Sequence, residues 1–377
     1  MRVCGFGRTP VIRRTGESMR SKTGSAALAA AAAALALTVG CSPTGGDRAA
    51  TAPPPSSVVL TDADSHGYIT FDTDRQVLTG YTHGGKRVWE EDRYFPTDVH
   101  CAASCPDAAV SATADMNKSA SGTQVLWKQD GHSTTQSFTD KSLVVQWARD
   151  KDTWVATTSS GISWSDHGTT HKETFAKGLA DSMGRLSADN GTLLISIQEN
   201  GGNSWSVYRF PLNKAGLSPS RIATDLPGSV GCLSPEQDTM WTLGDKAFEF
   251  NLTTGKKIRD VKKFASDCAS SKTSTVLGAF SADPDQSTQE ISITSGSRAT
   301  TFQKVTVRSS GEISVFRDCA VLLSNGKLTT LSARGTKTES EIDAHSMRTL
   351  PDGHVYSVAP SGKVAEHRID ASTCRIV

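Results

Sequence analysis

The sequence predicts an all-β protein, a β-propeller of seven or eight four-stranded blades, and two observations carry that prediction. From residue 57 onward the chain consists of short runs rich in Val, Ile, Thr, Trp and Phe, which alternate apolar with polar residues and end at Gly, Asn, Asp or Ser. Such runs are typical of strands separated by turns. Comparable strands recur about every 41 residues, and a period of roughly 40–45 with four short strands per unit is typical of propeller blades.

One comparable strand of each set can be marked along the chain, near residues 79, 126, 163, 207, 249, 292, 329 and 365. Eight marks predict eight blades within one propeller domain of residues 57–377. The alternative is seven blades with the first set split to close the ring, because Trp89 and Trp127 lie 38 residues apart and could be the equivalent pair. In either case each sheet needs neighbours to cover both of its faces, which favours a closed ring.

An apolar segment precedes the repeat. Residues 26–41, AALAAAAAALALTVGC, follow a basic stretch and run into Gly40 and Cys41. A basic stretch, an apolar stretch and a small residue before the cleavage site define a secretory signal. A cysteine directly after that small residue resembles a bacterial lipoprotein signal, although Thr38 stands where such signals usually carry Leu. We therefore expect a signal peptide over residues 1–40, lipidation of Cys41, and a short disordered tether over residues 41–56.

Two alternatives remain open for this segment. Cys41 could be a free cysteine of an ordinary secreted protein, and translation could start at Met19 rather than Met1, which leaves a more usual basic stretch. A membrane-spanning helix is disfavoured because it needs about 20 apolar residues.

Charge and cysteine content narrow the class of protein. The formal net charge is +1 with both signs interspersed, so no basic face for nucleic acid is predicted. Apart from Cys4 and Cys41, an even set of cysteines in an exported chain predicts disulfides. Sequence alone permits 15 pairings of six cysteines, and proximity along the chain favours Cys101–Cys105, Cys232–Cys268 and Cys319–Cys374. A zinc site using His100 lacks the second ligand pair that such sites need, so we expect no metal.

Three strand ends resemble the repeat of quinoprotein-like propellers, whose outer hairpin has the pattern aromatic-x-L-D-x-x-T-G-K-x-x-W. Residues 248–258 match with Asn251 in place of Asp, residues 370–377 match with Cys374 in place of Gly, and residues 81–89 keep the turn and Trp89. The resemblance implies the fold. Quinone-binding members hold a metal and a quinone in the central funnel, but no equivalent residues can be identified here, so the cofactor is unknown.

Two further turns resemble the Asp-box repeat of sialidase-like propellers, S-x-D-x-G-x-T-W. Asp166 and Gly168 fall in step with it, and Asn200 and Gly202 repeat the spacing 34 residues later. In that family the box is a turn device in which the acidic side chain caps backbone N–H groups and Gly takes a positive φ. The resemblance therefore implies a propeller and says little about sialidase activity.

No motif assigns a catalytic residue. The sequence contains no G-x-S-x-G, H-E-x-x-H or phosphate-loop pattern. Sialidase chemistry needs an arginine cluster, a Tyr–Glu pair and an Asp, and the tyrosines and arginines follow no pattern that assigns those roles. We interpret the closely spaced aspartates Asp62, Asp64, Asp72 and Asp74 as solvated turn residues. His167 and His171 lie four residues apart, but we do not expect them to bind a metal together.

We therefore expect a lipid-anchored, exported propeller on the outer face of a bacterial cell membrane. It is expected to act as a monomeric binding or scaffold module for an envelope protein, peptide or glycan. The alternative is a sialidase-like glycoside hydrolase, and a redox quinoprotein is a third option. We place the contact surface at the funnel end that bears the loops around residues 94–96 and Cys101–Cys105.

The lipid anchor and the disulfides predict the mass of the protein purified from its native membrane. We expect a chain that starts at Cys41 and carries added acyl chains. Reduction should add about 6 Da, two hydrogens for each of three disulfides. Intact mass spectrometry before and after reduction measures both, and a chain with an unmodified Cys41 would contradict the anchor.

Overall fold

The computed structural model describes residues 57–92, 96–113, 122–140, 142–175, 178–187, 191–199, 204–213, 216–227, 229–243, 247–261, 267–280, 288–296, 298–307 and 313–377. The expected signal peptide, Met19, Cys41 and the tether lie outside these residues. So do Asn200 and Gly202.

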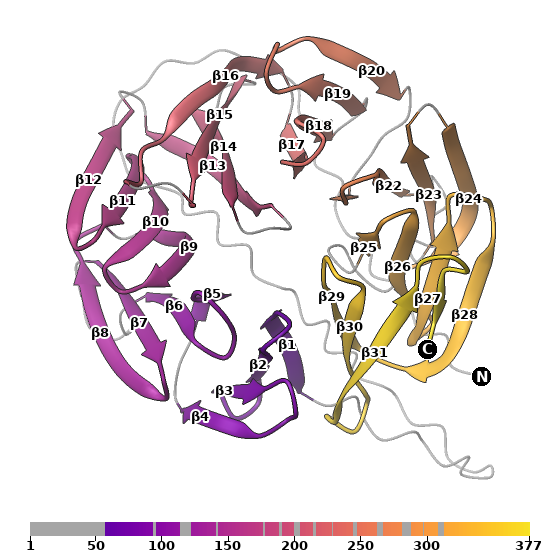
Figure 1. The fold of residues 1–377 in the computed structure, drawn as a ribbon, viewed down its shortest axis with the longest axis horizontal. Helices are drawn as coiled ribbons and strands as arrows, with labels where there is room; N and C mark the ends of the chain where they lie inside the picture. The colour runs from indigo at the N-terminus through magenta and orange to yellow at the C-terminus, as the bar shows by residue number, and fades with distance from the viewer. Residues whose placement is uncertain are drawn as a thin grey trace, which may run out of the picture. The chain divides into compact units, whose positions relative to one another are not determined.

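The described residues form eight antiparallel sheets of four strands, arranged as a propeller (Figure 1). Each sheet is one blade built from four consecutive strands, and we number the blades one to eight in chain order. The eight-blade prediction is therefore confirmed, and every residue marked from the sequence lies in the third strand of its blade. The seven-blade alternative is wrong, because Trp89 lies in a fourth strand and Trp127 in a third strand.

Successive first strands contact one another around the centre of the ring, and the fourth strands lie at its perimeter (Figure 1). The first strands are β1 (Val58–Ala63), β5 (Pro96–Cys101), β9 (Val144–Asp150), β13 (Leu179–Leu186), β17 (Ser229–Ser234), β21 (Asp267–Ser270), β25 (Ile313–Phe316) and β29 (Ser346–Thr349). The second strands are β2 (Gly67–Asp72), β6 (Ala108–Thr113), β10 (Thr153–Thr158), β14 (Thr192–Glu199), β18 (Thr239–Leu243), β22 (Ser274–Phe280), β26 (Cys319–Ser324) and β30 (His354–Val358).

The outer half of each blade follows the same order. The third strands are β3 (Val77–Thr82), β7 (Thr123–Gln129), β11 (Gly161–Asp166), β15 (Ser204–Pro211), β19 (Ala247–Asn251), β23 (Thr288–Ser295), β27 (Lys327–Ser332) and β31 (Val364–Asp370). The fourth strands are β4 (Arg87–Glu91), β8 (His132–Phe138), β12 (Thr169–Thr174), β16 (Ser220–Pro227), β20 (Lys257–Val261), β24 (Arg298–Thr306), β28 (Lys337–Asp343) and β32 (Arg375–Ile376).

Apolar side chains from neighbouring blades form the core between them. All six residues of β10 and of β26 are buried, whereas β8 and β28 are largely exposed. One cluster joins Val155 of blade three to Ile195 and Phe210 of blade four. Trp154 and Trp241 are fully buried, each in a cluster that joins two neighbouring blades. Burial between blades is therefore the main source of stability, because apolar area removed from water stabilises by about 25 cal/mol per Å².

Tight turns of the kind expected from the sequence connect the strands. Asn325 and Gly326, between β26 and β27, both have positive φ, as a two-residue hairpin turn requires. At the matched position of the quinoprotein-like hairpins, Gly255 has φ 66° and Cys374 has φ 53°. Cys374 thus takes the left-handed conformation that the motif usually assigns to glycine.

The described residues contain three disulfides, and these join the cysteines that lie nearest along the chain. Cys101–Cys105 closes the loop between β5 and β6 within blade two. Cys232–Cys268 joins blades five and six, and Cys319–Cys374 joins blades seven and eight. Blades eight and one share no strand, and among the described residues no disulfide joins them.

Packing between blades predicts a contrast between two Ile→Ala variants. Ile293 is fully buried between blades six and seven, whereas the side chain of Ile258 in β20 is 51% exposed. We expect Ile293→Ala to lower the free energy of unfolding by about 2–5 kcal/mol, and Ile258→Ala by less than about 0.5 kcal/mol. Denaturant unfolding measures both, and equal losses would contradict the packing described here.

Candidate functional site

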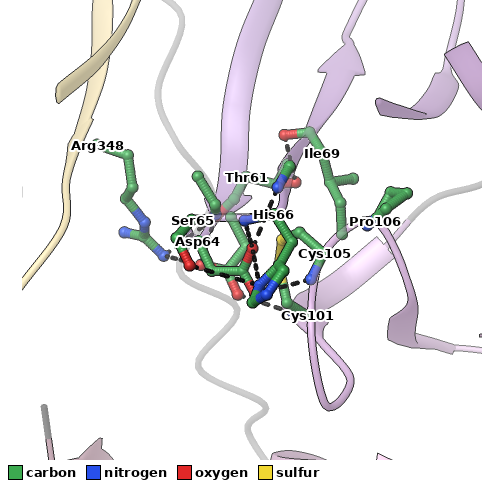
Figure 2. Close-up of a disulfide and its surroundings, with 12 residues drawn as sticks. Thr61, Asp64, Ser65, His66, Ile69, Cys101, Cys105, Pro106 and Arg348 are labelled. Atoms are coloured by element: carbon green, nitrogen blue, oxygen red, sulfur yellow. Dashed lines mark hydrogen bonds and ion pairs between the residues drawn. A yellow bond between two sulfur atoms is a disulfide. The ribbon is translucent and has the colours of Figure 1, made fainter. Parts of the chain in front are cut away.

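The candidate site lies at the end of the ring that carries the turns between first and second strands, which we call the AB end. Blade one contributes the β1–β2 turn, blade two the Cys101–Cys105 loop, and blade eight Arg348 from β29. Figure 2 shows these three segments together, although they come from opposite ends of the sequence.

Two carboxylates of blade one hold the disulfide loop of blade two. Asp62 Oδ2 accepts the backbone N–H of Cys101 at 2.8 Å, and Asp64 Oδ2 accepts that of Cys105 at 2.8 Å. The other oxygen of Asp64 accepts the N–H groups of His66 at 2.7 Å and Gly67 at 3.2 Å, which fixes its own turn. Hydrogen bonds to a charged group are stronger than neutral ones. Both ends of the loop are therefore tied to the neighbouring blade.

The loop has two more attachments. The indole N–H of Trp89 in blade one donates to Pro106 O at 2.8 Å, and the N–H of Ala103 donates to Ala148 O of blade three at 3.0 Å. Ala103 has φ 56° and its side chain is exposed. The loop is thus fixed by blades one and three and by its own disulfide, while its tip faces solvent.

Arg348 connects blade eight to the same place. Its Nη2 donates to Thr61 O at 3.1 Å and to Asp62 Oδ1 at 3.3 Å, and the side chain is 47% exposed. The carboxylate of Asp62 therefore bridges Arg348 and the Cys101 N–H. One aspartate links three blades.

His100 adds a titratable group beside the loop. Its Nε2 lies 2.7 Å from Asp98 Oδ2. Burial opposes protonation of this ring, but the hydrogen bond and charge of Asp98, with a contribution from Asp62, raise the pKa of His100 above its ordinary value. The charge of Arg348 acts against them. His100 thus belongs to the same electrostatic group.

The expected contact surface needs correction. The Cys101–Cys105 loop lies at the AB end, but Pro96 begins β5, at the other end of the same strand. Six extended residues separate the two points by about 17 Å, so they cannot share one end of the funnel. Tyr94 and Phe95 lie outside the described residues.

The aspartates also differ from the expectation. Asp62 and Asp64 are partly buried and cap backbone N–H groups, so their interpretation as solvated turn residues was wrong. Asp72 lies at the opposite end of blade one, where it accepts the N–H groups of Asp74 and Arg75. The sequence did contain a signal for this capping role, because Asp62 and Asp64 are two residues apart and both lie beside the same turn.

The first Asp-box-like turn has a structural role. His167 and Gly168 have φ 49° and 81°, and the hairpin closes with Asp166 opposite Thr169. Asp166 Oδ2 accepts the N–H of Leu217 in blade four at 3.1 Å; this contact and His167 lower the pKa of Asp166. The likeness to Asp-box repeats stays a prediction.

His167 and His171, which were not expected to bind a metal together, make contacts with other residues. His167 pairs with Asp166 at 2.7 Å, and the ring of His171 stacks on Trp164. Within the described ranges, no group of three His, Cys, Asp or Glu side chains is placed to hold a metal ion. In the same residues no helix is long and apolar enough to span a bilayer.

One pair bears on the glycoside hydrolase alternative. Tyr356 lies opposite Glu366 on one neighbouring strand and opposite Arg348 on the other. However, Tyr356 is only 1% exposed, and its hydroxyl lies 3.0 Å from His83 Nδ1. Burial raises the pKa of Tyr356, with Glu366 adding to the effect. A phenol held protonated between two blades cannot reach a substrate as a nucleophile.

Comparisons with known proteins show the fold. No family model and no curated protein matches the sequence. Among solved structures, BamB from Moraxella catarrhalis is similar at 13% identity and a TM-score of 0.50, over 84% of this chain and 99% of that one. The computationally designed protein Ika8 is similar at 10% identity and a TM-score of 0.54, over 84% and 98% of the two chains. At these identities the similarity concerns the propeller fold alone.

The contacts of Asp64 predict that its loss frees the disulfide loop. We expect Asp64→Ala to lower the free energy of unfolding by about 1–3 kcal/mol, because a buried N–H loses a charged acceptor. Amide hydrogen exchange at Cys105 should become faster. Asp74→Ala is the matched control, since Asp74 is exposed in another turn of the same blade. Unchanged exchange at Cys105 would contradict the capping role.

Proposed function

We propose that this protein is an exported, lipid-anchored propeller whose AB end presents a rigid binding surface to a partner protein. The observation that carries this proposal is the Cys101–Cys105 loop, which is held by Asp62, Asp64, Trp89 and Ala148 while its tip is exposed. A turn between two strands needs none of these attachments to connect them. Their number supports a role in presenting the loop in one fixed conformation.

Fixing a loop before binding raises affinity. Ordering a flexible segment on association costs conformational entropy, and a segment already ordered avoids that cost. In this protein the loop is ordered during folding, through contacts among three blades, so its conformational entropy is not lost again on binding. The arrangement therefore suits a binding module better than a catalyst that must move.

Hydrogen-bond donors at the AB end that are exposed to solvent indicate which chemical groups a partner would present. The carboxylates of Asp62 and Asp64 already accept backbone N–H groups and Arg348. Arg348 donates through Nη2, and among the described residues its Nε and Nη1 make no hydrogen bond. The ring of His66 is 68% exposed. These donors suit a protein surface with backbone carbonyls or carboxylates, since arginine is favoured at interfaces.

The proposed location rests on the lipoprotein-like segment that ends at Cys41. Lipidation of Cys41 would place the propeller at the outer face of the cell membrane, and a cysteine carrying two or three acyl chains anchors stably. The anchor then supplies location and the AB end supplies specificity. Binding to a membrane-associated partner also gains from the raised effective concentration of two proteins held on one surface.

Site-specific photo-crosslinking in intact cells tests the proposal. A photoreactive residue at Ala103 should give one discrete crosslinked product in the membrane fraction, identified by mass spectrometry. The control position is Ser361, an exposed residue in the β30–β31 turn at the opposite end of the ring. The product should be lost in Asp64→Ala and should re-form from the two purified proteins. Equal products at both positions, or none at Ala103, would refute the assignment.

A further inference from the structure

Near the AB end, five of the eight first strands carry a charged or titratable side chain at the same position. In each case it is the next-to-last residue of the strand: Asp62 in β1, His100 in β5, Arg149 in β9, Arg185 in β13 and Arg348 in β29. Because the first strands contact one another around the centre of the ring (Figure 1), this position lies at one level of the inner wall. We call the part formed by Asp62, His100, Arg185 and Arg348 the AB centre.

Arg149 is the member of this set that points away from the centre. Its Nη2 donates to Leu212 O, which follows the third strand of blade four, at 3.2 Å. Its guanidinium also lies over the ring of Trp147, 5.9 Å from the centroid, and Trp147 packs against the cluster between blades three and four. The side chain is thus directed toward the outer half of blade four.

Arg185 extends from blade four to blade six. Its Nη2 donates to Ser270 O, at the end of β21, at 3.2 Å, so the guanidinium passes the inner edge of blade five. Arg185 is exposed to solvent, yet the protein around it disfavours its charge. Burial lowers the pKa of the Arg185 guanidinium; the carboxylate of Glu236 acts against this effect, and the charge of Arg348 adds to it. The positive charge of Arg185 is therefore only partly balanced by the protein.

Arg348 approaches the same place from the opposite blade. In a ring of eight, blade eight lies across from blade four (Figure 1). The charge of Arg348 lowers the pKa of Arg185 and opposes the rise in the pKa of His100, so it acts on blades four and two. Its side chain is 47% exposed. Two guanidinium groups thus face the AB centre from opposite sides.

The carboxylates beside these arginines are already in use. Both oxygens of Asp62 accept hydrogen bonds, and both oxygens of Asp98 lie within 3.1 Å of a nitrogen. A guanidinium has five N–H donors. Among the described residues, only the Nη2 atoms of Arg185 and Arg348 make hydrogen bonds from these two side chains. The AB centre therefore suits a ligand that brings acceptor oxygens and negative charge.

We infer that Arg185 and Arg348 together form a binding site for one carboxylate of a polypeptide, at the centre of the AB end. Guanidinium groups bind carboxylates through two parallel N–H···O hydrogen bonds, which fix the orientation of the ligand. A monoanion suits this place better than a dianion such as phosphate. Asp62, Asp98 and Glu236 also act here, and their charges repel a second negative charge.

The carboxylate site is connected to the disulfide loop. Arg348 donates to Asp62, which accepts the N–H of Cys101, so the site and the loop belong to one hydrogen-bonded unit. A partner would contact the tip of the loop with its surface and insert its carboxylate at the AB centre. This use of the site rests on the proposed function, whereas carboxylate binding itself does not.

Titration of the full chain with short peptides tests the site. The probes are a blocked tripeptide with a free C-terminal carboxylate, its neutral C-terminal amide, and an amide whose central residue is glutamate. We expect the Nε–H NMR signals of Arg185 and Arg348, observed in protein with isotope-labelled arginine, to shift saturably with a carboxylate peptide and not with the neutral one. The two carboxylate peptides distinguish a chain terminus from a side chain as the preferred source.

Variants of two arginines at the same strand position separate the site from general charge effects. Arg185→Gln should weaken binding of the preferred peptide by about tenfold or more, because hydrogen bonds between charged groups are lost. Arg149→Gln is the matched control and should leave the affinity unchanged, since Arg149 donates to Leu212 O instead. Arg185→Lys keeps the charge without the paired donors and should bind with intermediate affinity. It replaces Arg185→Gln if that variant does not fold.

Three outcomes would overturn the carboxylate site: no saturable shift with either carboxylate peptide, equal losses in the Arg149 and Arg185 variants, or tighter binding of inorganic phosphate. Crosslinking at Ala103 distinguishes this inference from the proposed function. Peptide binding together with a crosslinked product that persists in Arg185→Gln would uphold the site and show that the partner does not use it. A product at Ala103 without peptide binding would uphold the proposed function and overturn the site.

Discussion

Each four-stranded blade has two apolar faces that only its neighbours can cover, and this constraint determines the rest of the structure. Second strands such as β10 and β26 are buried along their whole length because blades lie on both sides of them. No blade is complete alone, so the chain must close into a ring. Blades eight and one, like every other pair of neighbouring blades, share no strand, and side chains such as His345, Ser346 and Arg348 connect them.

Polar groups at the AB end follow from the same constraint. Loops that emerge where blades meet carry backbone N–H groups partly removed from water, and these need acceptors. Asp62 and Asp64 supply them to the loop of the next blade, and Arg348 balances the charge of Asp62. The contacts that satisfy the backbone also fix the loop. The rigid surface thus results from the hydrogen bonds that adjacent blades make to the backbone N–H groups of the loop.

Much of the fold could be predicted from the sequence, because strand periodicity and turn residues are local signals. The marked strands near residues 79 and 365 are both third strands, and Cys374 replaces the turn glycine in conformation as well as in sequence. The pairing of cysteines along the chain also corresponds to the blades that the disulfides join.

The site could be predicted only in part. Nothing local relates Arg348 to Asp62, which lie 286 residues apart, or His83 to Tyr356, which lie 273 apart. These residues are close only because the ring closes. The sequence predicts closure, but it does not predict which ends of the strands lie at the same end of the ring. For the same reason Pro96 and Cys101 were placed at one end of the funnel, although a full strand separates them.

The separation of 287 residues between His345 and Val58 has a further consequence for synthesis. Because every blade is made of consecutive residues, the blades emerge and assemble in order, each covering one face of the one before. The face of blade one that packs against blade eight is covered only after nearly the whole chain has been made. During that time an apolar surface with Tyr68 at its edge is open to water, so the growing protein is most vulnerable to aggregation or to chaperone capture until its last blade arrives.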